Sequence, residues 1–205
     1  MRAYMRNKFS YHGITSPIRK EFQKTLFAGL GPDIDPCVLA KQLWQVEYRE
    51  AHYVACDLLR QRLARKALQR IDPRQSLETL EWLITTNSWW DTVDSLAPNA
   101  SYSLLSRYPG VDLDATARTW IESENIWLQR SAIILQLKAG PATNPDLLFD
   151  LILRRADSTE FFVRKGAGWA LRQYSRIDPS AVRSFINDND GVLSPLTKRE
   201  GGKYC

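Results

Sequence analysis

Apolar residues recur at helical spacing along almost the whole chain, with polar residues between them. In the segment that begins near Ser88, the positions i, i+4, i+7 and i+8 of one helix face are Trp89, Val93, Leu96 and Ala97. Almost no segment alternates with period two, the pattern of a half-buried strand. The sequence therefore predicts an all-α protein.

Prolines and glycines divide this pattern into segments of helical length, because proline interrupts a helix and glycine weakens it. The expected breaks are Gly13–Pro17, Gly29–Pro36, Asp72–Pro73, Pro98, Pro109–Gly110, Gly140–Pro141, Pro145, Asp178–Pro179 and Gly191–Pro195. Three segments share an order of acid, aromatic, base, small residue and leucine-rich end, namely Glu47–Leu59, Glu124–Leu137 and Glu160–Leu171. This order is typical of the second helix of HEAT-like repeats, where small residues let neighbouring helices pack closely.

Three unusual side chains recur at the period of such repeats. Trp90 and Arg130 are 40 residues apart, and Arg130 and Trp169 are 39 apart. Two-helix repeats have a period of about 40 residues, and equivalent positions of successive repeats line one concave surface. We therefore expect a HEAT-like superhelix, an α-solenoid, in which these side chains converge on one ligand.

The composition is that of one globular domain spanning residues 1–205, with 44% hydrophobic and 25% charged residues. A net charge of +5 favours a polyanionic partner but does not identify one. No apolar stretch approaches the roughly 18 residues of a membrane span, and Met1–Lys8 leads into no signal-like apolar region. These features predict a cytoplasmic protein without a membrane partner.

The cysteines and histidines give no sign of a metal site. Cys37, Cys56 and Cys205 are isolated and odd in number, so we expect reduced thiols rather than disulfides. His12 and His52 occur in no zinc-binding motif. The sequence predicts neither a metal nor another cofactor.

Trp90 and Asp94 form a pair one helical turn apart, rotated about 100° from the stripe that contains Trp89. Two interpretations are open: the pair faces a ligand, or both indoles are buried and Asp94 is a solvated charge. A helix seldom buries two adjacent tryptophans, which favours the first.

Further along, Lys165, Trp169 and Arg172 share a helix face away from the apolar stripe Val163, Ala167, Ala170, Leu171 and Tyr174. An indole between two cations suits a sugar or base with phosphates on either side. The alternative is that Trp169 packs against a neighbouring repeat and its cations are incidental.

Arg130 lies in an almost wholly apolar helix, where an unpaired charge costs several kcal/mol. Its partner is either an internal carboxylate or a bound phosphate, for which the guanidinium is well shaped. Lys138 follows as a further phosphate candidate. The N-terminal residues around Tyr4 also mix cations with aromatics, although a frayed basic tail is an alternative for most of them.

The chain resembles the AlkD-type DNA alkylation repair glycosylases, a HEAT-like family. The matching runs are Tyr4–Phe9, Gly13–Pro17, Leu43–Trp44, Glu47–Glu50, Ser88–Asp94, Asn125–Arg130, Gln136–Lys138, Glu160–Phe162, Gly168–Trp169, Leu171–Arg172 and Pro195–Glu200. The resemblance implies a monofunctional glycosylase of base excision repair that removes N3- and N7-alkylated purines, such as 3-methyladenine and 7-methylguanine, from duplex DNA without base flipping.

The resemblance also implies roles for particular residues. Trp90, Asp94 and Trp169 would act on the deoxyribose of the lesion. The DNA-backbone and groove contacts that it implies are Arg130, Tyr4, Ser16, Lys138 and Arg172. The helix face described above adds Lys165 to the expected DNA contacts. Compared with the family, the chain is expected to be shortened at its N-terminus and at its C-terminus, and we expect a monomer.

Two competing functions remain open at this point. One is a noncatalytic HEAT-like module that binds bent or branched DNA, against which the presence of Asp94 argues. The other is a protein-interaction scaffold, against which the cations Lys138, Lys165 and Arg172 argue.

Overall fold

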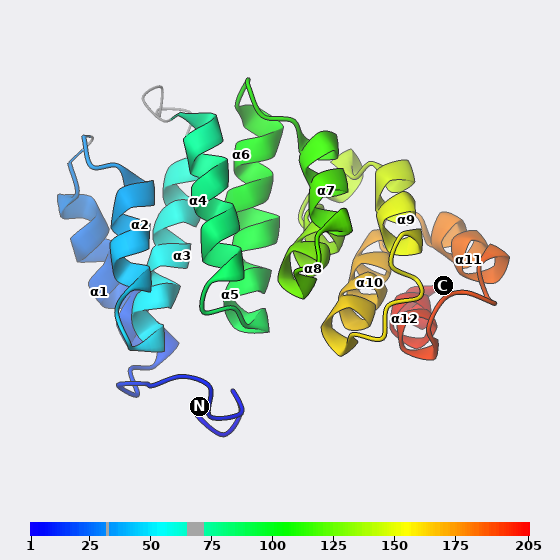
Figure 1. Cartoon of the computed structure of the whole chain (residues 1–205), viewed down its shortest axis with the longest axis horizontal. Coiled ribbons are helices and arrows are strands. Elements are labelled where there is room, and N and C mark those ends of the chain that lie inside the picture. The colour runs from blue at the N-terminus through cyan, green and yellow to red at the C-terminus, as the bar shows by residue number, and fades with distance from the viewer. Residues whose placement is uncertain (32, 65–71) are drawn as a thin grey trace.

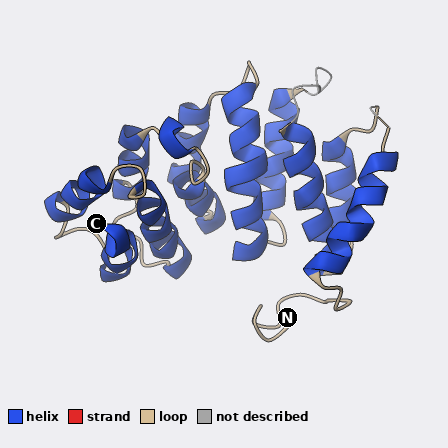
Figure 2. Ribbon diagram, turned by 180° about the vertical axis from the view of Figure 1, so that it is seen from behind, coloured by secondary structure: helices blue, strands red, loops and turns tan. Residues whose placement is uncertain are grey.

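The computed structural model describes residues 1–31, 33–64 and 72–205, and its regular elements are helices (Figures 1 and 2). Within these ranges, the only β-type pairing is an isolated bridge between Ser10 and Tyr48. The elements are α1 (Ser16–Gly29), α2 (Pro36–Trp44), α3 (Arg49–Leu63), α4 (Pro73–Thr85), α5 (Trp90–Ser95), the π-helical turn η1 (Leu96–Ser101), α6 (Tyr102–Arg107), α7 (Leu113–Glu122), α8 (Ile126–Ile134), the 3₁₀ turn η2 (Gly140–Ala142), α9 (Pro145–Leu153), α10 (Phe161–Tyr174), α11 (Pro179–Asp188), α12 (Pro195–Gly201) and the 3₁₀ turn η3 (Gly202–Tyr204). The prediction of an all-α protein is confirmed for the described residues.

Many of the helices begin where the sequence supplies a capping side chain. In α2, the Asp35 carboxylate accepts hydrogen bonds from the amides of Cys37 and Val38, while Pro36 occupies a first-turn position that needs no donor. The other side chains that accept from first-turn amides are Asp72, Asp112, Asn125, Asn144, Asp178 and Ser194. Most of the expected breaks are therefore helix starts. Pro32, within the expected break Gly29–Pro36, lies outside the described residues.

The expected break at Pro98 is wrong. The chain runs from α5 through η1 into α6 without leaving a helical conformation. Proline has no N–H and its ring collides with the carbonyl four residues earlier in an α-helix. The wider π-helical turn avoids that collision, and the side chain of Asn99 donates to the carbonyl of Ser95 at 2.7 Å. The helix that carries Asp94 therefore continues beyond the proline.

The helices pack in two layers, in the manner of helix pairs (Figures 1 and 2). In one layer α3 contacts η1, η1 contacts α8, α8 contacts α10, and α10 contacts α12. In the other, α2 contacts α4 and α7 contacts α9, while α2 pairs with α3 and α7 with α8 across the layers. The three similar segments of the sequence form α3, α8 and α10, all in the first layer. This arrangement is consistent with a helical-repeat fold.

The core lies between these layers. The predicted stripe Trp89, Val93, Leu96 and Ala97 is buried, and so are Val163, Ala167, Ala170 and Leu171 of α10. Tyr174, also expected in the core, is only partly buried and packs against it. None of the helices in the described ranges combines the length and the apolar character that crossing a membrane requires.

Candidate active site

Most of the predicted site residues line one hollow of about 390 Å³, which we call the indole hollow. It lies where the start of α5, the middle of α8, the exposed face of α10 and the N-terminal segment meet. Its lining residues are Tyr4, Arg6, Trp89, Trp90, Asp94, Arg130, Phe161, Phe162, Lys165, Trp169 and Arg172. Residues expected to converge because of their repeat spacing thus do converge.

Asp94 and Arg130 form a bidentate ion pair in the indole hollow. The Nε atom of Arg130 donates to Oδ1 of Asp94 at 2.7 Å, and Nη2 donates to Oδ2 at 2.8 Å. The remaining nitrogen, Nη1, donates to the carbonyl oxygen of Phe162. Of the two partners expected for Arg130, the structure therefore shows the internal carboxylate. It also shows that Asp94 is a paired charge rather than a solvated one.

Burial governs the electrostatics of this pair. Arg130 is 3% exposed, and Gly166 of α10 leaves room for it, because a β-carbon at that position would lie 3.1 Å from Nη1. Burial raises the pKa of Asp94, while the hydrogen bonds and charge of Arg130 oppose this rise. The guanidinium is therefore what favours an ionised carboxylate in the hollow.

The indoles form two walls of the hollow. Trp90 begins α5 and Trp169 lies on α10, and both are half-buried. The guanidinium carbon of Arg130 lies 6.0 Å from the centre of the Trp169 ring. Trp89, the neighbour of Trp90, also borders the hollow but is largely buried in the core, where its ring packs edge-on against Phe162 at 5.0 Å. The buried Trp89 thus anchors this turn of the chain, while the adjacent Trp90 lines the hollow.

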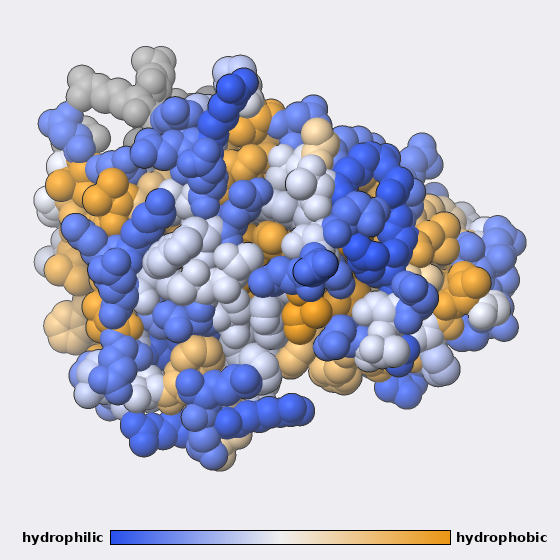
Figure 3. Space-filling model, in the orientation of Figure 1, coloured by the Kyte–Doolittle hydropathy of each residue, from blue (hydrophilic) through white to orange (hydrophobic). Residues whose placement is uncertain are grey.

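The N-terminal segment closes one side of the hollow and does not form the frayed tail considered above. Met5 is 3% exposed, and Tyr4 packs edge-on against Trp90 with ring centres 5.6 Å apart. The Glu50 carboxylate accepts from three successive amides, including that of Gly13 at 2.9 Å. Hydrophilic side chains cover this segment along the lower edge of the molecule (Figure 3). Tyr4 is nevertheless 70% exposed, which leaves it accessible to a ligand.

The cations Lys165 and Arg172 flank Trp169 as expected, but they share a protein partner. The carboxylate of Glu200, on α12, lies 3.0 Å from Nζ of Lys165 and 2.9 Å from Nη1 of Arg172. The two cations thus have a structural partner, and both interpretations of this helix face stay open. Sequence reasoning missed Glu200 as their partner, because the contact depends on how closely α12 approaches α10.

Two predicted contacts lie outside the indole hollow. Ser16 is an exposed residue at the start of α1. Lys138 donates to Oδ1 of Asn99 at 2.6 Å and lines a separate groove of about 890 Å³. The cations along this basic groove are Lys20, Lys24, Arg60, Arg62, Arg107 and Lys138. The groove and the hollow border the same continuous helix, α5–η1–α6.

Sequence reasoning also assigned no role to Phe161 and Arg6, which line the hollow. Phe161 is 54% exposed in the structure, and the signal in the sequence was the pair of adjacent phenylalanines, Phe161 and Phe162, of which one helix face can bury only one. Arg6 lies in the basic and aromatic N-terminal run, where the signal did not separate it from its neighbours.

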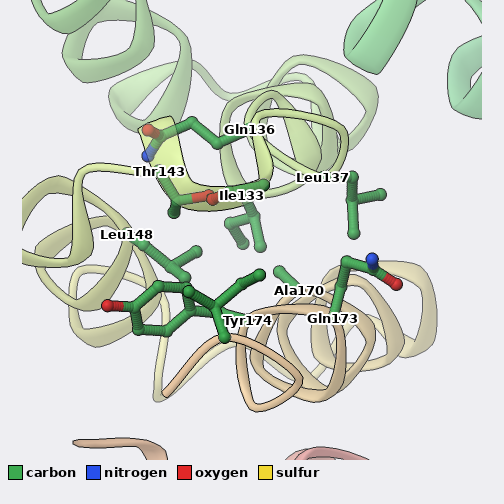
Figure 4. A pocket seen from close by; sticks show the side chains of 10 residues that line it. Ile133, Gln136, Leu137, Thr143, Leu148, Ala170, Gln173 and Tyr174 are labelled. Atoms are coloured by element: carbon green, nitrogen blue, oxygen red, sulfur yellow. The ribbon is translucent and has the colours of Figure 1, made fainter.

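Other features of the described residues offer less chemistry. A cavity of about 20 Å³ between α8 and α10 has room for about one water molecule, and its side chains, including Ile133, Leu148 and Ala170, are mainly apolar (Figure 4). Within residues 1–31, 33–64 and 72–205, no group of three or more His, Cys, Asp and Glu side chains is placed to hold a metal ion. Cys37 and Cys56 are buried, and burial raises the pKa of the Cys56 thiol to about 12.

Two comparisons with known proteins found similarity over the length of the chain. The family model described as "DNA alkylation repair enzyme" matches residues 1–205. A solved structure described as "Predicted DNA alkylation repair enzyme from Enterococcus faecalis" is similar, with a TM-score of 0.87 and 33% sequence identity, over 100% of this chain and 92% of that chain. No curated protein matches the chain.

Proposed function

The chain belongs to the DNA alkylation repair enzyme family, and from this premise we propose that it is a monofunctional DNA glycosylase. The proposed reaction is hydrolysis of the N-glycosidic bond of cationic N3- and N7-alkylated purines in duplex DNA, without base flipping. The observation that carries this proposal is the Asp94 carboxylate, which pairs with Arg130 and lines one open hollow together with Trp90 and Trp169.

The chemistry of such lesions suits this sparse set of groups. An N3- or N7-alkylated purine carries a formal positive charge, so it leaves as a neutral base and needs no general acid. As the bond from the purine nitrogen to C1′ breaks, positive charge moves to the sugar. A preorganised carboxylate stabilises that charge, and the faces of Trp90 and Trp169 attract it. Water then adds to C1′, and its extra proton passes to solvent.

Asp94 keeps acceptor capacity for this role. A carboxylate has about four lone-pair sites, and Arg130 occupies two of them. The remaining sites suit a water molecule next to the sugar carbon. Arg130 is therefore a positioning residue in this proposal, and its further role as a phosphate contact stays a prediction.

The surrounding cations support DNA as the partner. The repeats would form a superhelix with a concave basic face, along which the backbone of one strand passes through the basic groove that contains Lys138. Lys165, Arg172, Tyr4 and Ser16 would contact the backbone or groove near the lesion. Phosphate neutralisation by such cations supplies most of the nonspecific affinity of DNA-binding proteins. The protein would act as a monomer, without a metal or another cofactor.

One observation favours a second candidate, a noncatalytic module that binds bent or branched DNA. Both oxygens of Asp94 already accept hydrogen bonds from Arg130, which is also what a purely structural ion pair would show. The two candidates differ in their chemistry and not in their affinity for DNA.

Base release from a duplex carrying one N7-methylguanine separates the two functions. The glycosylase releases free 7-methylguanine and leaves an abasic site, whereas a matched duplex with guanine stays intact. Tight binding to the modified duplex without base release would instead support the noncatalytic module.

A further inference from the structure

Glu200 is a buried carboxylate at the edge of the indole hollow. It is 6% exposed, and three cations surround it. Its Oε1 atom lies 3.0 Å from Nζ of Lys165, while Oε2 lies 2.9 Å from Nη1 of Arg172 and 3.2 Å from Nζ of Lys203. Lys165 and Arg172 line the hollow on either side of Trp169, whereas Lys203 does not line it. One carboxylate thus connects the two cations that flank Trp169 along α10.

The backbone brings Glu200 to this position. A β-carbon on Gly168 would lie 2.6 Å from the β-carbon of Glu200 and 3.1 Å from the carbonyl oxygen of Thr197, so only glycine permits this approach of α12 to α10. The start of α12 is also fixed, because the hydroxyl of Thr197 donates to the carbonyl of Arg164 on α10 at 3.2 Å. The carboxylate is therefore built into the contact between these helices.

The charges of this cluster do not cancel completely. Hydrogen bonding to Lys165, followed by contacts with Lys203, lowers the pKa of Glu200, so the carboxylate stays ionised at neutral pH. Lys165 and Arg172 are each partly exposed, with side-chain exposures of 38% and 26%. Both keep N–H donors that Glu200 does not use. Both cations can approach a phosphate, but the negative charge of Glu200 neutralises part of their positive charge and weakens their attraction for it.

We propose that Glu200 is a positioning and specificity-determining residue, which holds Lys165 and Arg172 on either side of Trp169 and weakens their attraction for undamaged DNA. This inference rests on the proposed function in that phosphates approach the indole hollow. With the Glu200 carboxylate present, the two cations bind a DNA backbone strongly only when its phosphates lie against Trp169. They bind a backbone that passes farther away more weakly. Selectivity for the lesion then depends on a residue that touches neither the sugar nor the base.

The substitution Glu200→Gln tests this role, because it removes the charge and keeps the size of the side chain. Each cation that newly neutralises a phosphate steepens the plot of log affinity against log salt by about 0.9. We expect Glu200→Gln to bind undamaged duplex more tightly at low salt and to steepen this slope by about 0.9 to 1.8. The ratio of affinities for a 7-methylguanine duplex and an undamaged duplex should fall severalfold.

Two further variants serve as controls. Glu200→Asp keeps the charge and should retain a slope close to that of the wild-type protein. Asp190→Asn removes the negative charge that lies 2.6 Å from Nζ of Lys198. Lys198 is on α12, as Glu200 is, but it does not line the hollow. This substitution should change neither the slope nor the affinity ratio. Adding Arg172→Gln to Glu200→Gln should reverse part of the steeper slope.

The result that overturns the inference is a folded Glu200→Gln protein with the wild-type slope and affinity ratio, or one that binds all DNA more weakly. Loss of folding in Glu200→Gln together with wild-type behaviour in the Arg172→Gln and Lys165→Gln single variants would also overturn it. Wild-type protein that binds DNA without releasing the base would reject the glycosylase, while the slopes would still decide the role of Glu200. Absence of DNA binding by the wild-type protein would reject both.

Discussion

Asp94 and Arg130, on helices α5 and α8, meet in a bidentate pair with nitrogen–oxygen distances of 2.7 and 2.8 Å. Their side chains are 16% and 4% exposed, so each charge depends on the other for compensation. Arg130 thereby fixes both the direction and the charge of the carboxylate that faces the indole hollow. The same ion pair therefore underlies both the candidate chemistry and the stability of this region.

Replacing Arg130 by glutamine should change the pH dependence of base release. Burial already raises the pKa of Asp94, and Arg130 is the group that lowers it again. Without the guanidinium, Asp94 takes up a proton at a higher pH, so the acidic limb of the single-turnover rate profile should move to higher pH. An unmoved limb in the folded variant would mean that Asp94 is not the titrating group.

The same substitution should also destabilise the protein. Removing one partner of a buried ion pair costs about 3–5 kcal/mol, which urea unfolding at neutral pH would measure. Arg118→Gln is a suitable control, because Arg118 and its partner Asp150 are 45% and 35% exposed. Exposed pairs contribute about 0–1 kcal/mol. Equal losses in the two variants would show that burial does not determine the strength of the Arg130 pair.

His52 should make the stability depend on pH below neutrality. Burial, followed by the charge of Arg49, lowers the pKa of this histidine to about 4. The ring is therefore neutral at pH 7, with Nε2 3.0 Å from the carbonyl oxygen of Val46 and Nδ1 3.0 Å from Nη1 of Arg49. An unfolded chain takes up this proton near pH 6.5. As the pH falls from about 6.5 to about 4, the unfolded state binds more protons than the folded state. The contribution of His52 to the free energy of unfolding therefore falls by about 3 kcal/mol over this range.

Urea unfolding of the wild-type protein and of His52→Gln between pH 4 and pH 7.5 measures this contribution. The glutamine variant should be less stable at pH 7.5, but its stability should fall less steeply with acidification. If the free energy of unfolding falls equally with pH in both proteins, His52 is not buried in its neutral form. Other acid-sensitive groups are the same in both proteins, so they do not affect the comparison.

Gly168→Ala should destabilise the contact between α10 and α12. The added methyl group would lie 2.6 Å from the β-carbon of Glu200, so one of the helices must move. Overpacking of this kind costs about 1–3 kcal/mol. Gly29→Ala, at the end of α1 with open space around it, should instead be neutral or slightly stabilising. Thermal unfolding of both variants checks the prediction, and an unchanged midpoint for Gly168→Ala would contradict it.

The sequence was sufficient to predict most of the helices, apart from the one that continues through Pro98, and the convergence of Trp90, Arg130 and Trp169. Helical periodicity identifies the buried faces, and the repeat period of about 40 residues places equivalent positions next to one another. Both properties are local or periodic, so they can be recognised without coordinates.

The contacts between side chains could not be predicted in the same way. That Arg130 pairs with Asp94, and that Glu200 pairs with Lys165 and Arg172, depends on the register and separation of neighbouring helices. Pro98 was misleading because its local effect, the loss of one N–H, is absorbed by a π-helical turn. These outcomes are set by tertiary packing, which periodicity does not describe.

The central claim is that the Asp94 carboxylate stabilises the transition state, and single-turnover release of 7-methylguanine by the wild-type protein and Asp94→Asn tests it most directly. The matched control is Asp91→Asn, because Asp91 pairs with the buried Arg49 at 2.6 Å and does not line the hollow. We predict that Asp94→Asn lowers the rate by about 10²- to 10³-fold with duplex affinity preserved, while folded Asp91→Asn keeps its rate. Release by folded Asp94→Asn at the wild-type rate would contradict the account.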